Sequence, residues 1–353
     1  MNPAFWAGKR VFLTGHTGFK GGWLALWLDS LGASVHGYST APPTEPNLFT
    51  VGRVAERLAS HQVGDIRDAP TLAQAMATAR PDVVFHLAAQ SLVRESYREP
   101  TDTYAVNVLG TVNVLEAVRG CHGVRAVVSV TTDKCYENRE WPWGYRENEP
   151  LGGRDPYSSS KACAELVTAA YRDSFLAQRG VAVATARAGN VIGGGDWAAD
   201  RLLPDFFRAL DAGRVMDVRS PRATRPWQHV LEPLAGYLLL AEKLVSEGAV
   251  HAQGWNFGPA DVDVRPVGWV LDHLVRGSRR GSWQHTPGEH PHEAAILKLD
   301  SSKARGQLGW RPRWDLATAL DQTLEWHTEW REGHDMQAAC LRQIAAYDRA
   351  EAG

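Results

Sequence analysis

The sequence predicts an α/β fold in which helices cover both faces of a doubly wound parallel sheet, followed by a smaller C-terminal lobe. Two observations predict this fold class. Short runs rich in β-forming residues alternate with helical patterns through the first half of the chain, as in successive βαβ units. A glycine-rich turn also joins the first expected strand to the first expected helix.

The alternation fixes the expected order of elements. Strands are expected at residues 10–14, 34–38, 61–64, 83–86, 125–130 and 181–187, and the longer helices at 22–31, 101–119 and 156–178. After about Asn190 the pattern loosens into glycines, prolines and short helices. We therefore expect a first domain over 1–189 and a smaller lobe over 190–353, with room for some of its segments to return to the first domain. Ligands bind at the carboxyl ends of strands in such sheets, so this lobe is expected to close over a substrate cleft there.

Composition excludes several classes of protein. The chain has 353 residues and a formal net charge of −2, which gives no long-range field suited to nucleic acid or an anionic membrane. Its first residues lack a signal-peptide pattern, and no run reaches the roughly 18 apolar residues of a membrane span. The four cysteines show neither CxxC spacing nor a disulfide framework, so a reducing cytoplasm is the expected location.

One polar segment invites a metal site. It contains His285, Glu289, His290, His292 and Glu293. The spacing matches no familiar zinc pattern, and two prolines interrupt the segment. We interpret it as a polar loop near the cleft and expect no metal.

The turn after the first strand has the pattern of a dinucleotide site. Glycines at positions 15, 18 and 21 let the backbone turn tightly and approach a pyrophosphate, which the amino end of the next helix stabilises. A glycine trio also occurs in ordinary turns. Its place between a strand and a helix favours a Rossmann-like cofactor site.

Tyr157 and Lys161 lie four residues apart on a predicted helix, hence on one face. A phenol has a pKa near 10, and a neighbouring ammonium lowers it enough for the pair to take a proton from a hydroxyl. This spacing also occurs by chance as a surface pair. Here it follows the fifth strand, Thr132 lies just past that strand, and Asn107 lies in the preceding helix.

These motifs resemble the extended short-chain dehydrogenase/reductase family. Two further matches are Asp65-Ile66, after the third strand, and His86-Leu87-Ala88-Ala89, which ends the fourth. The resemblance implies a Thr132–Tyr157–Lys161 active site and NAD bound by Gly15, His16, Gly18, Phe19, Gly21, Asp65, Ile66, Leu87, Ala88, Ala89, Asn107, Tyr157 and Lys161. The second strand departs from the pattern, because it ends Tyr38-Ser39-Thr40 without an acidic residue for the ribose. It has no arginine for a 2′-phosphate either, so NAD is favoured over NADP.

Asp133 and Lys134, directly after Thr132, resemble the sugar-nucleotide 4,6-dehydratase branch of that family. So do the longer runs 15–23, 131–138 and 188–197. The resemblance implies oxidation at C4 by Tyr157 and NAD, loss of water across C5 and C6 with Asp133 as the acid, and hydride return to C6. It also implies CDP-glucose as the substrate. The residues alone do not identify the base, so dTDP-, GDP- and UDP-linked sugars stay open.

The role of Lys134 is open. It takes the C5 proton if its pKa is lowered, it stays charged and stabilises the enolate, or it is merely paired to Asp133. The closest alternative function is an epimerase or decarboxylase on another sugar nucleotide. A regulator that keeps the fold without catalysis is a different class, and it would be expected to lose the Tyr157–Lys161 pair.

The substrate pyrophosphate needs cations, and the second lobe offers several. Arg201, Arg219 and Arg225 are the candidates, and the resemblance implies contacts from Asn190 and from at least one of Arg219 and Arg225, whereas Arg222 is as readily a solvated loop residue. The helices at 101–119 and 156–178 are those that the family uses in a four-helix dimer interface, so a homodimer is expected. Its contact faces would carry Val108, Val112, Leu115, Leu166, Ala169 and Ala170.

Overall fold

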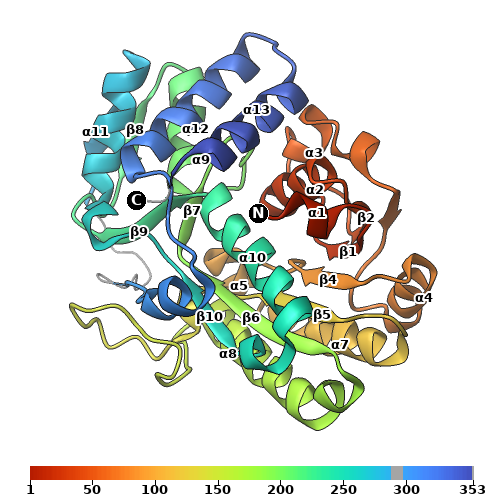
Figure 1. The fold of residues 1–353 in the computed structure, drawn as a ribbon. Helices are drawn as coiled ribbons and strands as arrows, with labels where there is room; N and C mark the ends of the chain where they lie inside the picture. The colour runs from red at the N-terminus through yellow and green to blue at the C-terminus, as the bar shows by residue number, and fades with distance from the viewer. Residues whose placement is uncertain (288–296, 352–353) are drawn as a thin grey trace.

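The computed structural model describes residues 1–287 and 297–351. Its main sheet has seven strands in the order β10-β6-β5-β4-β1-β2-β3, and all neighbouring pairs are parallel. The doubly wound α/β fold is therefore confirmed (Figure 1). The strands are β1 (Arg10–Thr14), β2 (Ser34–Ser39), β3 (Ser60–Val63), β4 (Val83–His86), β5 (Ala126–Val130), β6 (Ala182–Ala188) and β10 (Gly254–Phe257).

Helices cover both faces of this sheet because the side chains of each buried strand alternate between two cores. Val83 and Phe85 of β4 lie in the core beneath α2 (Phe19–Ser30) and α10 (Leu231–Glu247). Val84 lies in the opposite core, with α4 (Ala69–Ala79) and α7 (Gly110–Gly120). Strands buried on both faces read as near-continuous apolar runs, which is the pattern in the sequence.

The two long helices expected at 101–119 and 156–178 each contain an irregular turn. The first is α6 (Pro100–Tyr104), the π-helical η2 (Ala105–Leu109) and α7 in succession. The second is α8 (Pro156–Tyr171), followed by η4 (Arg172–Leu176) and η5 (Ala177–Arg179). Asp155 caps α8 by accepting the N–H of Ser158, and Pro156 occupies its first turn. The cap fixes the first turn of α8 and therefore the position of Tyr157, which lies in that turn.

The second half of the chain builds smaller units above the carboxyl ends of the main strands. One sheet has the order β11-β9-β7, and β8 pairs with β12. Their core contains Phe206, Leu271 and Leu320. The elements are β7 (Asn190–Ile192), α9 (Leu202–Asp211), β8 (Val215–Val218), β9 (Thr224–His229), β11 (Val264–Pro266), α11 (Val267–Ser278), β12 (Ser282–His285), α12 (Leu316–Arg331) and α13 (Met336–Arg349).

Short helical turns complete the fold: α1 (Pro3–Trp6), α3 (Leu48–Val51), η1 (Val54–Arg57), α5 (Val93–Arg98), η3 (Asp133–Cys135), η6 (Gly248–His251), η7 (Asp261–Asp263) and η8 (Ala304–Leu308). Among the described residues, none of the helices combines the length and apolar content needed to cross a bilayer.

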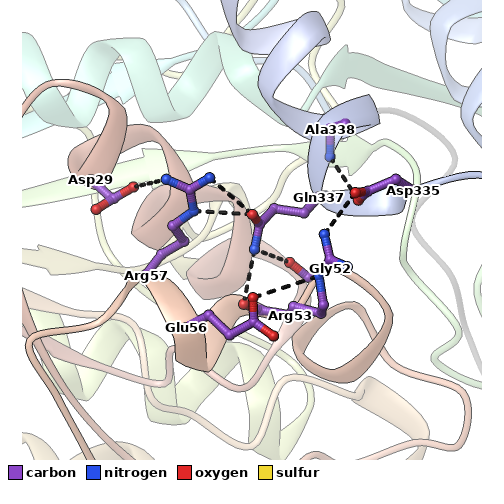
Figure 2. Close-up of polar contacts among 8 residues, drawn as sticks. All are labelled: Asp29, Gly52, Arg53, Glu56, Arg57, Asp335, Gln337 and Ala338. Carbon is purple, nitrogen blue, oxygen red and sulfur yellow. Dashed lines mark hydrogen bonds and ion pairs between the residues drawn. The ribbon is translucent and has the colours of Figure 1, made fainter.

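The C-terminal helix α13 returns to the first domain and binds the segment after β2 (Figure 2). The Gln337 amide donates to the carbonyls of Gly52 and Arg53, and its oxygen accepts two hydrogen bonds from the Arg57 guanidinium at 3.0 Å. Arg53 also pairs with Asp335 at 2.7 Å. These contacts hold in place a loop whose preceding residues line the cavity described below.

One expectation about the long helices was wrong. Leu115, placed on an outer face, is 1% exposed and belongs to the core between α7 and the sheet. Helical drift across the π turn moves the outward face to Leu109, which is 60% exposed, as is Leu166 on α8.

Candidate active site

A cavity of about 1120 Å³ lies at the carboxyl ends of the main strands, between the two halves of the chain. It brings together most of the residues expected at the site, from segments far apart in sequence. Those that line it are Gly15, Gly18, Phe19, Gly21, Asp65, Ile66, Leu87, Ala88, Ala89, Thr132, Lys134, Tyr157, Lys161, Asn190, Arg201, Arg219 and Arg225. His16, Asn107 and Asp133 lie behind its wall.

The glycine-rich turn fits a pyrophosphate. Gly15 has φ +80°, and a Cβ there would lie 2.7 Å from the Ala88 nitrogen. A Cβ on Gly21 would lie 2.1 Å from the Gly15 carbonyl oxygen. Helix α2 begins after Gly18 and has no side-chain cap, so the N–H groups of its first turn are free to donate hydrogen bonds to an anion.

The His16 imidazole does not face the cavity, which corrects its expected place among the cofactor contacts. The ring is buried, and its Nε2 lies 2.7 Å from Nδ1 of His61. Burial, and then the neighbouring His61, lowers the pKa of His16 to about 4. The ring fills the space left by Gly37, where a Cβ would lie 2.6 Å from the His16 Cγ.

Asn107 likewise lies behind the wall, where it connects two segments that do reach the cavity. Its oxygen accepts the Gln90 N–H, and its Nδ2 donates to the Gln90 carbonyl and to the Ser160 hydroxyl, each at 2.9 Å. It is 1% exposed. Asn107 therefore positions the end of β4 against α8 and does not line the site.

At the far end of the cavity, Asp65 forms hydrogen bonds with Arg67, the shortest at 2.6 Å. Hydrogen bonding from Arg67 holds the pKa of Asp65 below its ordinary value. The carboxylate is ionised and already partnered.

Tyr157 is protonated in this structure at neutral pH. Burial raises its pKa to about 12, whereas the hydrogen bond with the Thr132 hydroxyl and the charge of Arg201 lower it. Lys161, expected to be the main depressing charge, donates to the Val130 carbonyl at 3.2 Å, and burial lowers its own pKa to about 8. Thr132, Tyr157 and Lys161 line one cavity, and Thr132 and Arg201 are the groups that lower the pKa of the phenol.

Asp133 and Lys134 face each other. The Lys134 Nζ lies 3.6 Å from Asp133 Oδ1, which also accepts the Thr132 hydroxyl at 3.0 Å. The Asp133 side chain is 1% exposed and that of Lys134 is 32% exposed. Among the described residues Asp133 Oδ2 has no partner, and it lies 3.1 Å from where a Cβ on Gly189 would be. A free acceptor thus lies just beneath a glycine of the cavity wall.

A buried ion pair supports the catalytic residues from behind. Glu165, one helical turn after Lys161, binds Arg187 through Nε at 2.9 Å and Nη2 at 2.7 Å. The same carboxylate accepts the hydroxyls of Thr131 and Thr185. Sequence reasoning missed this pair. The signal was a charged residue inside the fully buried strand β6.

The second half of the chain contributes cations to the opposite wall. Arg201 pairs with Asp196 at 2.9 Å, and Arg219 and Arg225 also line the cavity, whereas Arg222 is exposed and does not. The Asn190 side-chain oxygen is buried and has no partner within the described part of the chain. Lys20, to which sequence reasoning gave no role, lines the cavity as well. The segment with Glu289, His290, His292 and Glu293 lies outside the described residues.

Known proteins are similar to this chain in both sequence and fold. The family model described as GDP-mannose 4,6 dehydratase matches residues 12–323. A CDP-glucose 4,6-dehydratase of Salmonella typhimurium is 53% identical over 98% of each chain, and a dTDP-glucose 4,6-dehydratase of Streptomyces antibioticus is 32% identical over 75% of each. A dTDP-glucose 4,6-dehydratase from Streptomyces venezuelae, solved with NAD bound, superposes with a TM-score of 0.78 at 26% identity, covering 93% of this chain and 99% of the other.

Proposed function

This chain belongs to the GDP-mannose 4,6-dehydratase family, and within it we propose a hydro-lyase that converts CDP-glucose to CDP-4-keto-6-deoxyglucose and water. The observation that carries this proposal is the Asp133–Lys134 pair beside Tyr157 at one cavity. An epimerase or a simple dehydrogenase needs no acid for a leaving hydroxyl. The 53% identity with the Salmonella enzyme supports CDP as the nucleotide.

The cofactor is NAD, which accepts a hydride from C4 of the sugar and returns it to C6 when bound. We propose that the Gly15–Gly21 turn and the first turn of α2 hold its pyrophosphate, with Asp65 and Ile66 at the adenosine end. Leu87, Ala88 and Ala89 give the small surface along which the cofactor lies. The close approach of Gly15 to Ala88 supports this, because a side chain at either turn glycine would disrupt the cradle.

Tyr157 and its neighbours begin the reaction. The phenol must lose its proton before it accepts that of the C4 hydroxyl, and the Thr132 hydroxyl and Arg201 both favour the phenolate. Lys161 adds an ammonium on the same face of α8. We assign proton transfer at C4 to Tyr157 and its support to Thr132 and Lys161.

Asp133 and Lys134 complete the elimination. Once C4 is a ketone the C5 proton is acidic, and we propose that water accepts this proton while a protonated Asp133 transfers its own proton to the 6-hydroxyl, which leaves as water. The Lys134 Nζ lies 3.6 Å from Asp133 Oδ1. We therefore propose that Lys134 stabilises the developing enolate and orients Asp133. The pairing of Lys134 with Asp133, one of the alternatives left open by the sequence, is then part of this role.

The nucleotide is proposed to bind against the 190–353 part of the chain. Asn190 offers an unpartnered acceptor, and Arg201, Arg219 and Arg225 offer cations for the substrate pyrophosphate. We keep the division at 189/190 as a proposal, with β10 and α10 as segments of the second part that belong structurally with the first sheet.

We also propose a cytoplasmic homodimer. All four cysteines are free, which suits a reducing compartment. Leu109 and Leu166 expose apolar surface on the two long helices and suit a four-helix contact between copies. Light scattering that shows a monomer at micromolar concentration would remove the dimer.

Product analysis tests the function directly. We expect the protein to convert CDP-glucose to a product lighter by one water, measured by mass spectrometry, with dTDP-, UDP- and GDP-linked sugars as parallel substrates. A product of unchanged mass indicates epimerisation and overturns the proposal. Turnover of another nucleotide sugar in preference to CDP-glucose overturns the substrate assignment only.

A further inference from the structure

One cation of the cavity has no place in the proposed reaction. Lys20 is the second residue of α2, and its side chain lines the cavity together with Lys134, Lys161 and Arg201. Each of those three has a partner: Asp133 at 3.6 Å, the Val130 carbonyl at 3.2 Å and Asp196 at 2.9 Å, respectively. Within residues 1–287 and 297–351, the Lys20 ammonium makes no ion pair and donates no hydrogen bond.

The charges around Lys20 leave this part of the cavity positive. The charges that act on Lys20 are those of three cations, Arg201, Lys161 and Lys134, and of one carboxylate, Asp133. Three further aspartates that line the cavity have arginine partners, Asp65 with Arg67, Asp200 with Arg94 and Asp205 with Arg208, whereas Asp155 and Asp217 accept hydrogen bonds from uncharged groups. An excess of buried positive charge is costly unless an anion compensates it.

The position of Lys20 indicates where that anion lies. The first turn of α2 has no side-chain cap, so its leading N–H groups point their positive ends toward the same space as the ammonium. Backbone N–H groups at a helix start bind phosphate oxygens, and a lysine adds a full charge to them. Both features favour phosphate over a carboxylate bound elsewhere in the cavity.

We propose that Lys20 is a ligand-binding residue for a diphosphate, which it holds together with the N–H groups of the glycine-rich turn. This rests on the proposed function, which brings two diphosphates into the cavity, that of NAD and that of the nucleotide sugar. Lys20 lines the same cavity as Gly15, Gly18 and Gly21, and it adds a side-chain cation to the N–H groups of this turn.

The proposal has a thermodynamic consequence. Burial, and then the charges of Arg201, Lys161 and Lys134, lower the pKa of Lys20 to about 7, while Asp133 opposes them. A diphosphate raises that pKa again, because it favours the charged form. Above the free value, binding therefore takes up a proton, and the affinity falls as the pH rises.

Calorimetry on the full chain, freed of bound nucleotide, measures this uptake. NAD and CDP are titrated separately about one pH unit above the free pKa of Lys20, in two buffers of different ionisation enthalpy. We expect proton uptake with the ligand whose diphosphate meets Lys20. Lys20→Met should lose most of that uptake and bind the same ligand about ten- to a hundredfold more weakly.

Lys20→Arg is the matched control. A guanidinium stays charged throughout, so this variant should retain affinity without proton uptake from position 20. It also separates loss of charge from loss of folding, and circular dichroism compares the three proteins. Lys161, whose pKa is also lowered, contributes equally to all of them.

Two results would overturn the proposal. In one, Lys20→Met binds NAD and CDP with wild-type affinity and wild-type proton uptake. In the other, it binds both normally but no longer exchanges the C5 hydrogen of substrate with deuterium from solvent, which would make Lys20 a base. Failure of the wild type to dehydrate CDP-glucose would instead remove the proposed function and leave the NAD titration informative.

Discussion

The two walls of the cavity hold their polar side chains in different ways. On the wall from residues 1–189, Thr132 follows β5, and Tyr157 and Lys161 lie on α8, with the Glu165–Arg187 pair buried behind them. On the wall from 190–353, Arg201, Arg219 and Arg225 come from α9 and β9 or the segments that flank them. The comparison shows that the groups proposed to move protons have a buried ion pair behind them, while the groups proposed to bind the nucleotide are partly exposed.

The largest expected effect is on the first wall. Asp133→Asn should lower kcat by about 10²–10⁴-fold, because the leaving hydroxyl loses its acid, while C4 oxidation continues. Reduced nicotinamide would then accumulate, which absorbance measures in a single turnover. Lys134→Met should give the same pattern.

Tyr157→Phe is the control for these variants, because it should prevent the nicotinamide from being reduced at all. If Asp133→Asn and Lys134→Met both turned over at the wild-type rate, the assignment of the elimination to this pair would be wrong.

The support behind the first wall should affect stability. Glu165→Gln leaves Arg187 charged and buried without its counter-ion, so the free energy of unfolding should fall by about 3–5 kcal/mol. Urea denaturation measures it. Glu116→Gln, which removes an exposed pair with Arg119, is the matched control and should change it by less than about 1 kcal/mol.

The same pair predicts a pH dependence. Burial raises the pKa of Glu165, but the hydrogen bonds and charge of Arg187 outweigh it, so the folded pKa lies below the ordinary 4.5. Its contribution is then fully present above that value and lost as the pH falls through the folded pKa. The stability difference between wild type and Glu165→Gln should shrink on acidification. A difference that grew instead would contradict the direction of the shift.

The second wall should respond in KM. Arg225→Met or Arg219→Met should raise KM for CDP-glucose about tenfold with kcat nearly unchanged, because each removes binding shared by ground and transition states. Arg222→Met, outside the cavity, should stay within about twofold of wild type. Equal effects of all three would show that the cavity contacts do not distinguish them.

The smallest effect concerns the link between α13 and the loop after β2. Arg53→Ala removes an ion pair whose side chains are 47% and 49% exposed, so the free energy of unfolding should change by about 0.2–1 kcal/mol. Thermal unfolding measures it. A fall in the free energy of unfolding as large as that of Glu165→Gln would contradict the distinction between buried and exposed ion pairs.

The sequence placed most of the expected residues of both walls at the cavity, and for the first wall the physical reason is clear. Gly15, Thr132 and Tyr157 occupy positions set by regular strands and helices, so local pattern was enough to place them. The direction in which side chains point was harder to predict from the sequence. The inward turn of His16 depends on the space at Gly37, and the clamp by Asn107 depends on a π turn, neither of which is visible in periodicity.

Contacts across long sequence separation account for the rest. The Glu165–Arg187 pair joins α8 to β6. The three neighbours that lower the pKa of Lys20, Arg201, Lys161 and Lys134, come from three segments. Charge balance of that kind is known only when the segments are assembled.

The seventh strand has a consequence for biosynthesis. β10 (Gly254–Phe257) pairs with β6 and leaves the ribosome well after the strand it protects. Until β10 is made, β6 is an edge strand with one side unpaired, although its side chains are all buried in the finished protein. The nascent first half therefore cannot complete its sheet until β10 has been made, and a fragment that ends at residue 189 should self-associate. Completion of the main sheet waits for a strand from the second half of the chain.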